Sequence, residues 1–125
     1  MKVIGVDFET YYDQDYSLSK LTTEAYIRDP RFQIIGVSIK VDRNKSKWFS
    51  GTDQELLSFL DKHIDWADDA ILCHNTAFDG AILSWVLGRS PRLWLDTLSM
   101  ARPLHLKTIG VSLWALSRHY KLGEK

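Results

Sequence analysis

Five short apolar segments, each about the length of a β-strand, limit what this chain can fold into. They span residues 2–7, 32–41, 47–49, 70–74 and 93–97. Segment 32–41 is rich in β-branched residues, and the polar residues 42–46 predict a hairpin turn that pairs it with 47–49. Only a short helical turn near 22–27 separates the first two segments, whereas helical patterns alternate with the last two. This order predicts an α/β fold with a five-stranded mixed sheet and helices on both faces.

Helical patterns separate the later strands. The sequence Thr52-Asp53-Gln54-Glu55 has the form of a capping box, and apolar residues follow it at helical spacing. A second helix is predicted over residues 79–87, with Gly88 just beyond its end. Ser112 is expected to cap a last helix. Trp85 and Trp114 occupy apolar helix positions, so we expect both in the core.

The composition bounds the class of protein. A length of 125 residues with 45% hydrophobic residues fits one domain with a substantial core. No apolar run approaches the roughly 20 residues of a membrane span, and the N-terminus lacks the features of a signal peptide. We therefore expect a cytoplasmic protein. Cys73 is the only cysteine, which excludes an internal disulfide, and it is expected to be a small buried residue.

Charge is balanced over the whole chain but not along it. Sixteen basic and sixteen acidic residues give a net charge of zero, which excludes the strongly basic composition of proteins that coat nucleic-acid duplexes. Residues 102–125 hold five Lys or Arg against one acid. This end of the chain is a candidate to face phosphates, although a solvated basic helix end explains the same bias.

Two carboxylates close the first apolar segment. Asp7 and Glu9 lie two residues apart, and strand side chains alternate between faces, so both project from the same side of the pleat. Two like charges this close are costly unless a divalent cation neutralises them, and oxygen ligands suit Mg²⁺ or Mn²⁺ rather than zinc. The carboxyl end of a strand is also where α/β sheets place ligands. These residues predict a metal site, with a solvated strand end as the alternative.

A second motif, His74-Asn75-Thr76-Ala77-Phe78-Asp79, follows the fourth apolar segment. Asp79 supplies a third carboxylate where a helix is predicted to begin. In the alternative interpretation, Asn75 and Thr76 are turn and capping residues, Phe78 packs in the core, and the helix N-terminus stabilises Asp79. The two interpretations are compatible, and the presence of both motifs favours a nuclease more than either motif alone.

The two motifs together resemble the first and second motifs of the DEDD 3′–5′ exonucleases. Residues 7–41, including Tyr26-Ile27-Arg28-Asp29-Pro30-Arg31, further resemble the proofreading domain of phage-type family A DNA polymerases. The resemblance covers nearly the whole chain. It implies a ribonuclease H-like fold, two Mg²⁺ or Mn²⁺ ions, and phosphodiester hydrolysis at the 3′ end of single-stranded DNA, with a nucleotide monophosphate as the bound product.

The resemblance also implies a role for each site residue. Asp7 would bridge both metal ions, Glu9 would serve the ion that activates water, and Asp79 would hold the ion near the leaving 3′ oxygen. Asp96 would have a secondary role, although a strand-ending Asp that caps the next turn is the preferred interpretation. The residues expected to contact the substrate are Phe8, Thr10, His74, Asn75 and Phe78. Phe8 points away from the two acids, so core packing is favoured for it.

One part of the family pattern is missing. The family carries a fourth acid, an Asp four residues after a Tyr or His. Tyr120 and Glu124 have this spacing with the longer acid, which we interpret as a coincidence. We therefore expect residues 1–125 to be an exonuclease-like fragment, truncated at its C-terminus, of a longer chain that carries a polymerase domain as partner. The fourth carboxylate would then lie on a helix beyond Lys125.

Two other functions fit parts of the sequence. Haloacid-dehalogenase-like phosphatases carry an Asp-x-Asp-x-Thr motif after an apolar strand, but Glu9 is one methylene too long for the second Asp, and no matching Lys site follows. The other alternative is a catalytically incomplete fragment that binds nucleic acid or packs on a polymerase. The missing fourth acid supports it.

Overall fold

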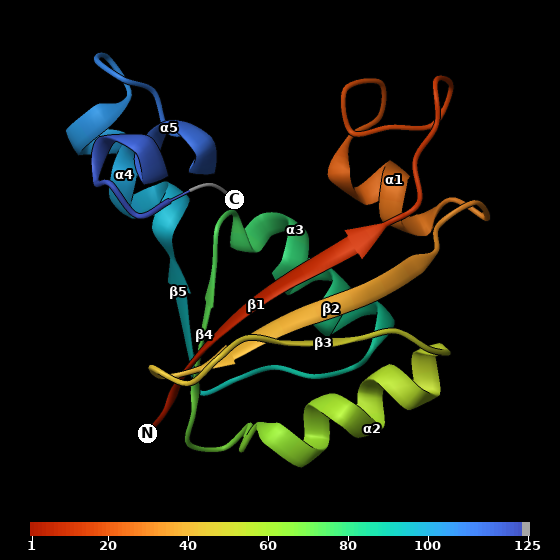
Figure 1. Cartoon of the computed structure of the whole chain (residues 1–125). Coiled ribbons are helices and arrows are strands. Elements are labelled where there is room, and N and C mark those ends of the chain that lie inside the picture. The colour runs from red at the N-terminus through yellow and green to blue at the C-terminus, as the bar shows by residue number, and fades with distance from the viewer. Residues whose placement is uncertain (124–125) are drawn as a thin grey trace.

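The computed structural model describes residues 1–123 and has an α/β fold (Figure 1). Its strands are β1 (Val3–Thr10), β2 (Ile34–Val41), β3 (Lys47–Phe49), β4 (Ala70–Cys73) and β5 (Leu93–Asp96). They form one five-stranded sheet in the order β3-β2-β1-β4-β5. β2 pairs antiparallel with β1 and β3, whereas β4 runs parallel to β1 and β5. The predicted five-stranded mixed sheet is confirmed.

The helices occupy the connections between strands and follow β5. They are α1 (Thr23–Arg28), α2 (Asp53–His63), α3 (Thr76–Ala81), the π-helical segment η1 (Ile82–Val86), α4 (Thr97–His105) and α5 (Leu113–His119). Thr52 and Glu55 form the predicted capping box of α2, and Ser112 caps α5 through the backbone N–H of Ala115. The helix predicted over 79–87 begins three residues earlier, at Thr76, and continues as η1. Gly88 follows with a positive φ of 67°.

The sheet buries one face of β1. Ile4, Val6 and Phe8 are at most 4% exposed, which confirms the expected core position of Phe8. Opposite them on β2, in register, lie Val41, Ile39 and Val37. The helices add apolar side chains to the same cluster: Leu56 and Leu60 of α2, and Ile82 and Leu83 of η1. Cys73 is buried here too, as expected.

The prediction that Trp85 and Trp114 lie in the core is wrong. The two side chains are 49% and 59% exposed. The guanidinium of Arg28 lies 4.8 Å from the ring centre of Trp85, and that of Arg118 lies 4.8 Å from the ring centre of Trp114. A cation over an indole ring is a favourable surface contact. Helical spacing alone does not tell such a contact from burial.

The other face of the sheet carries a pocket of about 330 Å³. Gly5, Asp7 and Lys40 line this pocket, and so does Leu113 of α5. Figure 1 shows α1 and the loop before it on one side of the carboxyl end of β1, with α4 and α5 on the other side. Within residues 1–123, no helix has the length and apolar character needed to cross a membrane.

Candidate functional site

A pocket of about 430 Å³ lies at the carboxyl ends of β1 and β4, and three carboxylates line it. Asp7 and Glu9 reach it from β1, and Asp79 reaches it from α3. The structure therefore brings together two motifs that lie some seventy residues apart in the sequence. All five predicted substrate contacts also line the pocket: Phe8, Thr10, His74, Asn75 and Phe78. The remaining lining residues are Tyr12, Ser17, Leu18 and Tyr26.

Strand alternation places the first two acids. Asp7 is half-buried and Glu9 exposed, whereas their neighbours on β1 toward the core face are buried. The pairing register shifts between Glu9 and Thr10, where Thr10 pairs with Ile34 and Glu9 with Gly36. Such an irregularity bends a strand and redirects its side chains, and it is common next to functional sites. β1 therefore ends with an altered direction just after its second carboxylate.

Asp79 is held against β1. Its side chain is only 4% exposed, and its Oδ1 accepts a hydrogen bond of 3.0 Å from the backbone N–H of Phe8. Because Phe8 lies between Asp7 and Glu9, this bond places the third carboxylate beside the backbone that carries the other two. The helix N-terminus also favours a negative charge in the first turn of α3.

Cys73 lies close enough to the acidic residues for their charges to affect its thiol. Burial raises the pKa of the Cys73 thiol, and the charges of Asp79, Asp96 and Asp7 raise it further. A thiol with a raised pKa stays protonated and is a poor nucleophile. Its burial and its raised pKa both fit the expected role of Cys73 as a small core residue.

Asp96 holds the turn between β4 and α3. Its Oδ1 accepts hydrogen bonds from the backbone N–H groups of Asn75 and Leu98, each at 2.9 Å. Its Oδ2 accepts from the N–H and hydroxyl of Thr76 at 3.2 and 3.0 Å, and from the Ser99 hydroxyl at 3.2 Å. Burial alone would raise the pKa of Asp96, but these bonds outweigh it and lower the pKa to about 2. The predicted capping role is confirmed at Leu98, the second helical residue of α4.

The same carboxylate caps a second helix, which the sequence did not reveal. Asn75 has a positive φ of 84° and makes no side-chain capping bond to α3. The N–H of Thr76, the first residue of α3, and the N–H of Asn75 just before it find their acceptor in Asp96, on the neighbouring strand. This explains why α3 begins before the predicted start. Asp96 thus supports the turn that leads to Asp79.

His74 also connects parts of the fold. Its Nδ1 lies 2.9 Å from the hydroxyl of Thr97, and its Nε2 donates to the carbonyl of Val111 at 2.8 Å. The hydroxyl of Thr97 further donates to the carbonyl of Cys73 at 3.2 Å. His74 lines the acid pocket, but both of its ring nitrogens have protein partners. Its visible role is to tie β4 to α4 and to the segment before α5.

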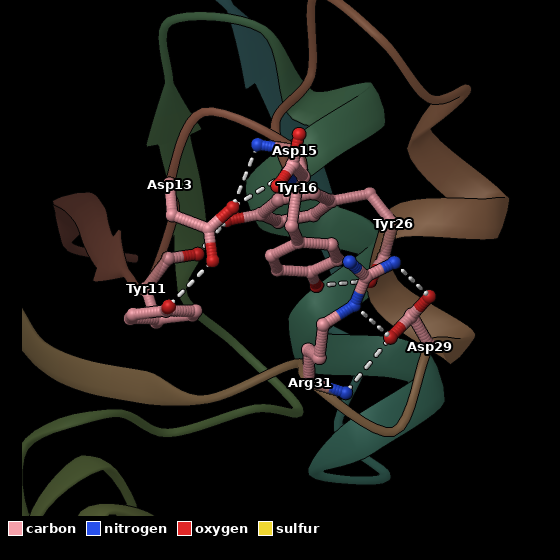
Figure 2. Close-up of polar contacts among 7 residues, drawn as sticks. All are labelled: Tyr11, Asp13, Asp15, Tyr16, Tyr26, Asp29 and Arg31. Carbon is pink, nitrogen blue, oxygen red and sulfur yellow. Dashed lines mark hydrogen bonds and ion pairs between the residues drawn. The ribbon is translucent and has the colours of Figure 1, made fainter.

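Residues 11–31, for which the sequence predicts a loop with a short helical turn, contain a cluster of tyrosines that the prediction does not include. Figure 2 shows Tyr11, Tyr16 and Tyr26 packed together, with Asp13 and Arg31 around them. Tyr16 is fully buried and stacks on Tyr26 with ring centres 4.5 Å apart. Asp13 accepts from the N–H of Tyr16 at 2.8 Å, and the Arg31 guanidinium lies 4.7 Å from the Tyr16 ring centre. The frequency of Tyr in this segment was the available signal.

The donor chemistry of the pocket suits a hard cation. Three carboxylates offer only oxygen, the ligand type that Mg²⁺ and Mn²⁺ prefer. Among residues 1–123, however, no three His, Cys, Asp or Glu side chains converge closely enough to hold a metal ion. Like-charge repulsion opposes a closer approach of carboxylates without a cation. The chemistry of these carboxylates therefore fits Mg²⁺ or Mn²⁺. Their side chains, however, are not close enough together to coordinate an ion as they stand.

The spacing Tyr120-x-x-x-Glu124 has no structural test, because Glu124 lies outside the described residues 1–123. The hydroxyl of Tyr120 lies 2.6 Å from Nε2 of His105. Both side chains line an apolar pocket between α4 and α5 that contains none of the three site carboxylates.

A comparison with models of known protein families found no match, and a search of curated proteins found none either.

Proposed function

We propose that this chain is a ribonuclease H-like 3′–5′ exonuclease domain of the proofreading type, which hydrolyses single-stranded DNA from its 3′ end with divalent metal ions. The observation that supports the proposal is the single pocket lined by Asp7, Glu9 and Asp79. Both sequence motifs that resemble those of the DEDD exonucleases contribute residues to this pocket. A volume of about 430 Å³ is in the range of small-molecule sites and suits a terminal nucleotide.

The three acids would hold Mg²⁺ or Mn²⁺, which supply positive charge to the attacking and leaving oxygens of an in-line displacement when bound. Without cations these carboxylates would repel a phosphodiester, so cation binding is a condition for substrate binding. The hydrogen bond from the Phe8 N–H keeps the Asp79 carboxylate beside β1. Tyr12 and Leu18 are 74% and 46% exposed at the pocket and offer apolar surface to a base.

The second candidate function is nucleic-acid binding without catalysis. The observation that favours it is the lack, among residues 1–123, of a convergent group of metal-binding side chains. Such a fragment would retain an oligonucleotide but would not shorten it. A polymerase domain and the cytoplasm remain the proposed partner and location of the exonuclease.

The test is a time course with single-stranded DNA labelled at its 5′ end, in Mn²⁺ and in EDTA. We expect shortening from the 3′ end only with metal. Asp7→Ala and Asp79→Ala should each lower the rate by about 10²–10³ or more, because each removes transition-state charge stabilisation. Asp53→Ala, a change at an exposed acid of α2 away from the pocket, is the control and should leave the rate unchanged.

Three outcomes separate the possibilities. Metal-dependent shortening that is lost in the two pocket variants supports the exonuclease. Retention of the oligonucleotide without shortening, in Mn²⁺ and at high protein concentration, supports the binding fragment instead. Near wild-type hydrolysis by purified Asp7→Ala protein would show that the acid pocket is not the active site.

A further inference from the structure

Tyr26 of α1 is nearly fully buried, and its hydroxyl group reaches the end of β1. The hydroxyl donates a hydrogen bond of 2.5 Å to the carbonyl of Tyr11 and lies 2.8 Å from the hydroxyl of Thr10. A phenol has one proton, which the carbonyl of Tyr11 receives, so the Thr10 hydroxyl is the donor in the second bond. The partners, Thr10 and Tyr11, are the first two residues after Glu9. The Tyr26 hydroxyl therefore fixes the segment where the register of β1 shifts.

The ring of Tyr26 contacts the other segment of the site. Its centre lies 6.0 Å from that of Phe78, in a tilted arrangement with an angle of 51° between the planes. Phe78 immediately precedes Asp79 on α3. One side chain thus touches the backbone after Glu9 and the residue before Asp79.

The surroundings hold Tyr26 itself in place. Figure 2 shows Tyr16 lying flat against it, and the Tyr16 hydroxyl donates to the Tyr26 carbonyl at 2.5 Å. The two rings are nearly parallel, with 7° between their planes, and Phe32 packs edge-on against Tyr26 at 5.9 Å. Because Tyr16 stacks on the Tyr26 ring and Phe32 packs edge-on against it, this ring has little freedom to move.

The hydroxyl is the informative part of this arrangement. A phenylalanine would fill the same apolar space without the desolvation cost of a buried polar group. This hydroxyl is fully bonded, and both of its bonds go to the chain beside one of the three acids. Packing of the ring in the core would not require a hydroxyl with these partners.

We propose that Tyr26 is a positioning residue of the acid pocket, holding the segment that carries Glu9 at a fixed distance from the segment that carries Asp79. The inference rests on the proposed function, since the acids so placed are the proposed ligands of the cations. Tyr26 does not itself bind metal. Its effect is on how readily the carboxylates accept cations.

The test compares Tyr26→Phe with Tyr16→Phe, a closely matched control. Each change removes one buried hydroxyl that donates to a backbone carbonyl at 2.5 Å. The partner of the Tyr16 hydroxyl is the carbonyl of Tyr26, but Tyr16→Phe keeps the ring stacked on Tyr26 and leaves both bonds of the Tyr26 hydroxyl in place. Mn²⁺ affinity is measured by calorimetry without DNA, and stability by thermal unfolding in EDTA. We expect similar losses of stability in both variants. Only Tyr26→Phe should weaken Mn²⁺ binding, by about tenfold, as for residues that orient metal ligands.

Thr10→Val serves as a second variant if Tyr26→Phe fails to fold, because it removes the partner hydroxyl with little change of shape. It should weaken Mn²⁺ binding in the same direction. Wild-type affinity in Tyr26→Phe or, failing that, in Thr10→Val would overturn the positioning role alone. An equal loss of affinity in Tyr16→Phe would overturn it too, since general loosening would then explain both. Absence of Mn²⁺ binding by the wild-type protein would overturn the proposed function, and the positioning role with it.

Discussion

We predict that Asp96→Asn lowers the free energy of unfolding by about 2–3 kcal/mol at neutral pH, a range built from the hydrogen bonds it loses. If the amide oxygen takes the place of Oδ1, it keeps the bonds from the N–H groups of Asn75 and Leu98. The amide nitrogen then replaces Oδ2, which accepts from the N–H and hydroxyl of Thr76 and from the hydroxyl of Ser99. A donor would face these donors. The N–H of Thr76 loses its acceptor at the start of α3.

The magnitude follows from these bonds. A hydrogen bond to a charged acceptor contributes about 1.5–3 kcal/mol, and an unsatisfied buried donor costs about 1–3 kcal/mol. The hydroxyls of Thr76 and Ser99 can turn toward water, so we count the N–H of Thr76 and the lost charge, and not all three bonds. Asp96→Ala removes every bond from Asp96 to both helices and should cost about 2 kcal/mol more, because it also leaves the two N–H groups of Asn75 and Leu98 unpaired, at about 1 kcal/mol or more each.

The pH dependence of this loss has a definite sign. The pKa of Asp96 is lowered to about 2 in the folded protein, against an ordinary value of 3.8. A lowered folded pKa means that the stabilisation is present above the unfolded pKa and is lost as the pH falls from about 4 to about 2. One pKa unit corresponds to about 1.4 kcal/mol, and partial exposure reduces the expected contribution to about 1–2 kcal/mol.

The assay is urea unfolding of the wild-type and Asp96→Asn proteins at pH 7 and near pH 2. Their difference should shrink by about 1–2 kcal/mol in acid, since the wild-type carboxyl becomes protonated there. Asp42→Asn is the control, because Asp42 is exposed and its Oδ1 accepts a hydrogen bond of 2.9 Å from the backbone N–H of Val3. A difference below about 0.5 kcal/mol at pH 7, or one that does not change with pH, would refute the role assigned to this carboxylate.

Three further predictions concern other parts of the molecule. Gly36→Ala should destabilise the protein by about 1–3 kcal/mol in chemical unfolding, because its Cβ would lie 2.7 Å from the Phe49 carbonyl oxygen and 2.4 Å from the Trp48 ring; a neutral effect would mean that β3 shifts easily. Trp85→Ala should cost at most about 1 kcal/mol, since it loses a surface contact with Arg28, and a larger loss would restore the core interpretation. Mn²⁺ or Mg²⁺ at millimolar concentration should raise the melting temperature more than Zn²⁺ does, and no shift with any divalent ion would count against an oxygen-ligand site.

The strands and the capped helices were predictable because their signals are local. An apolar run bounded by polar residues identifies β4 without knowledge of its neighbours. The capping box of Thr52 and Glu55 is complete within four residues, and so is the bond from Ser112 to α5. Each of these depends on residues that are close in sequence, and each is confirmed.

The features that the sequence did not reveal depend on residues far apart. No helix was predicted over Thr97–His105, where Pro103 removes a backbone donor and opposes a helix. The start of α3 was misplaced because its acceptor, Asp96, is 20 residues or more away. The hydroxyl of Tyr26 finds its partners 15 and 16 residues back along the chain. A periodic pattern carries no information about such partners.

The proximity of the two acidic motifs is partly predictable from the sequence. The motifs are far apart along the chain, but their proximity follows from the relative direction of two strands, β1 and β4. β1 and β4 run parallel, with Gly5 opposite Leu72. If this register is continued by two residues, just past the end of β4 at Cys73, it brings Asp7 level with His74, so both motifs lie at the same edge of the sheet. An antiparallel pair would have placed them at opposite ends. What the register does not set is how closely the carboxylates approach, since that depends on the bond from Phe8 to Asp79, on the contacts of Tyr26, and on the charge of any bound cation.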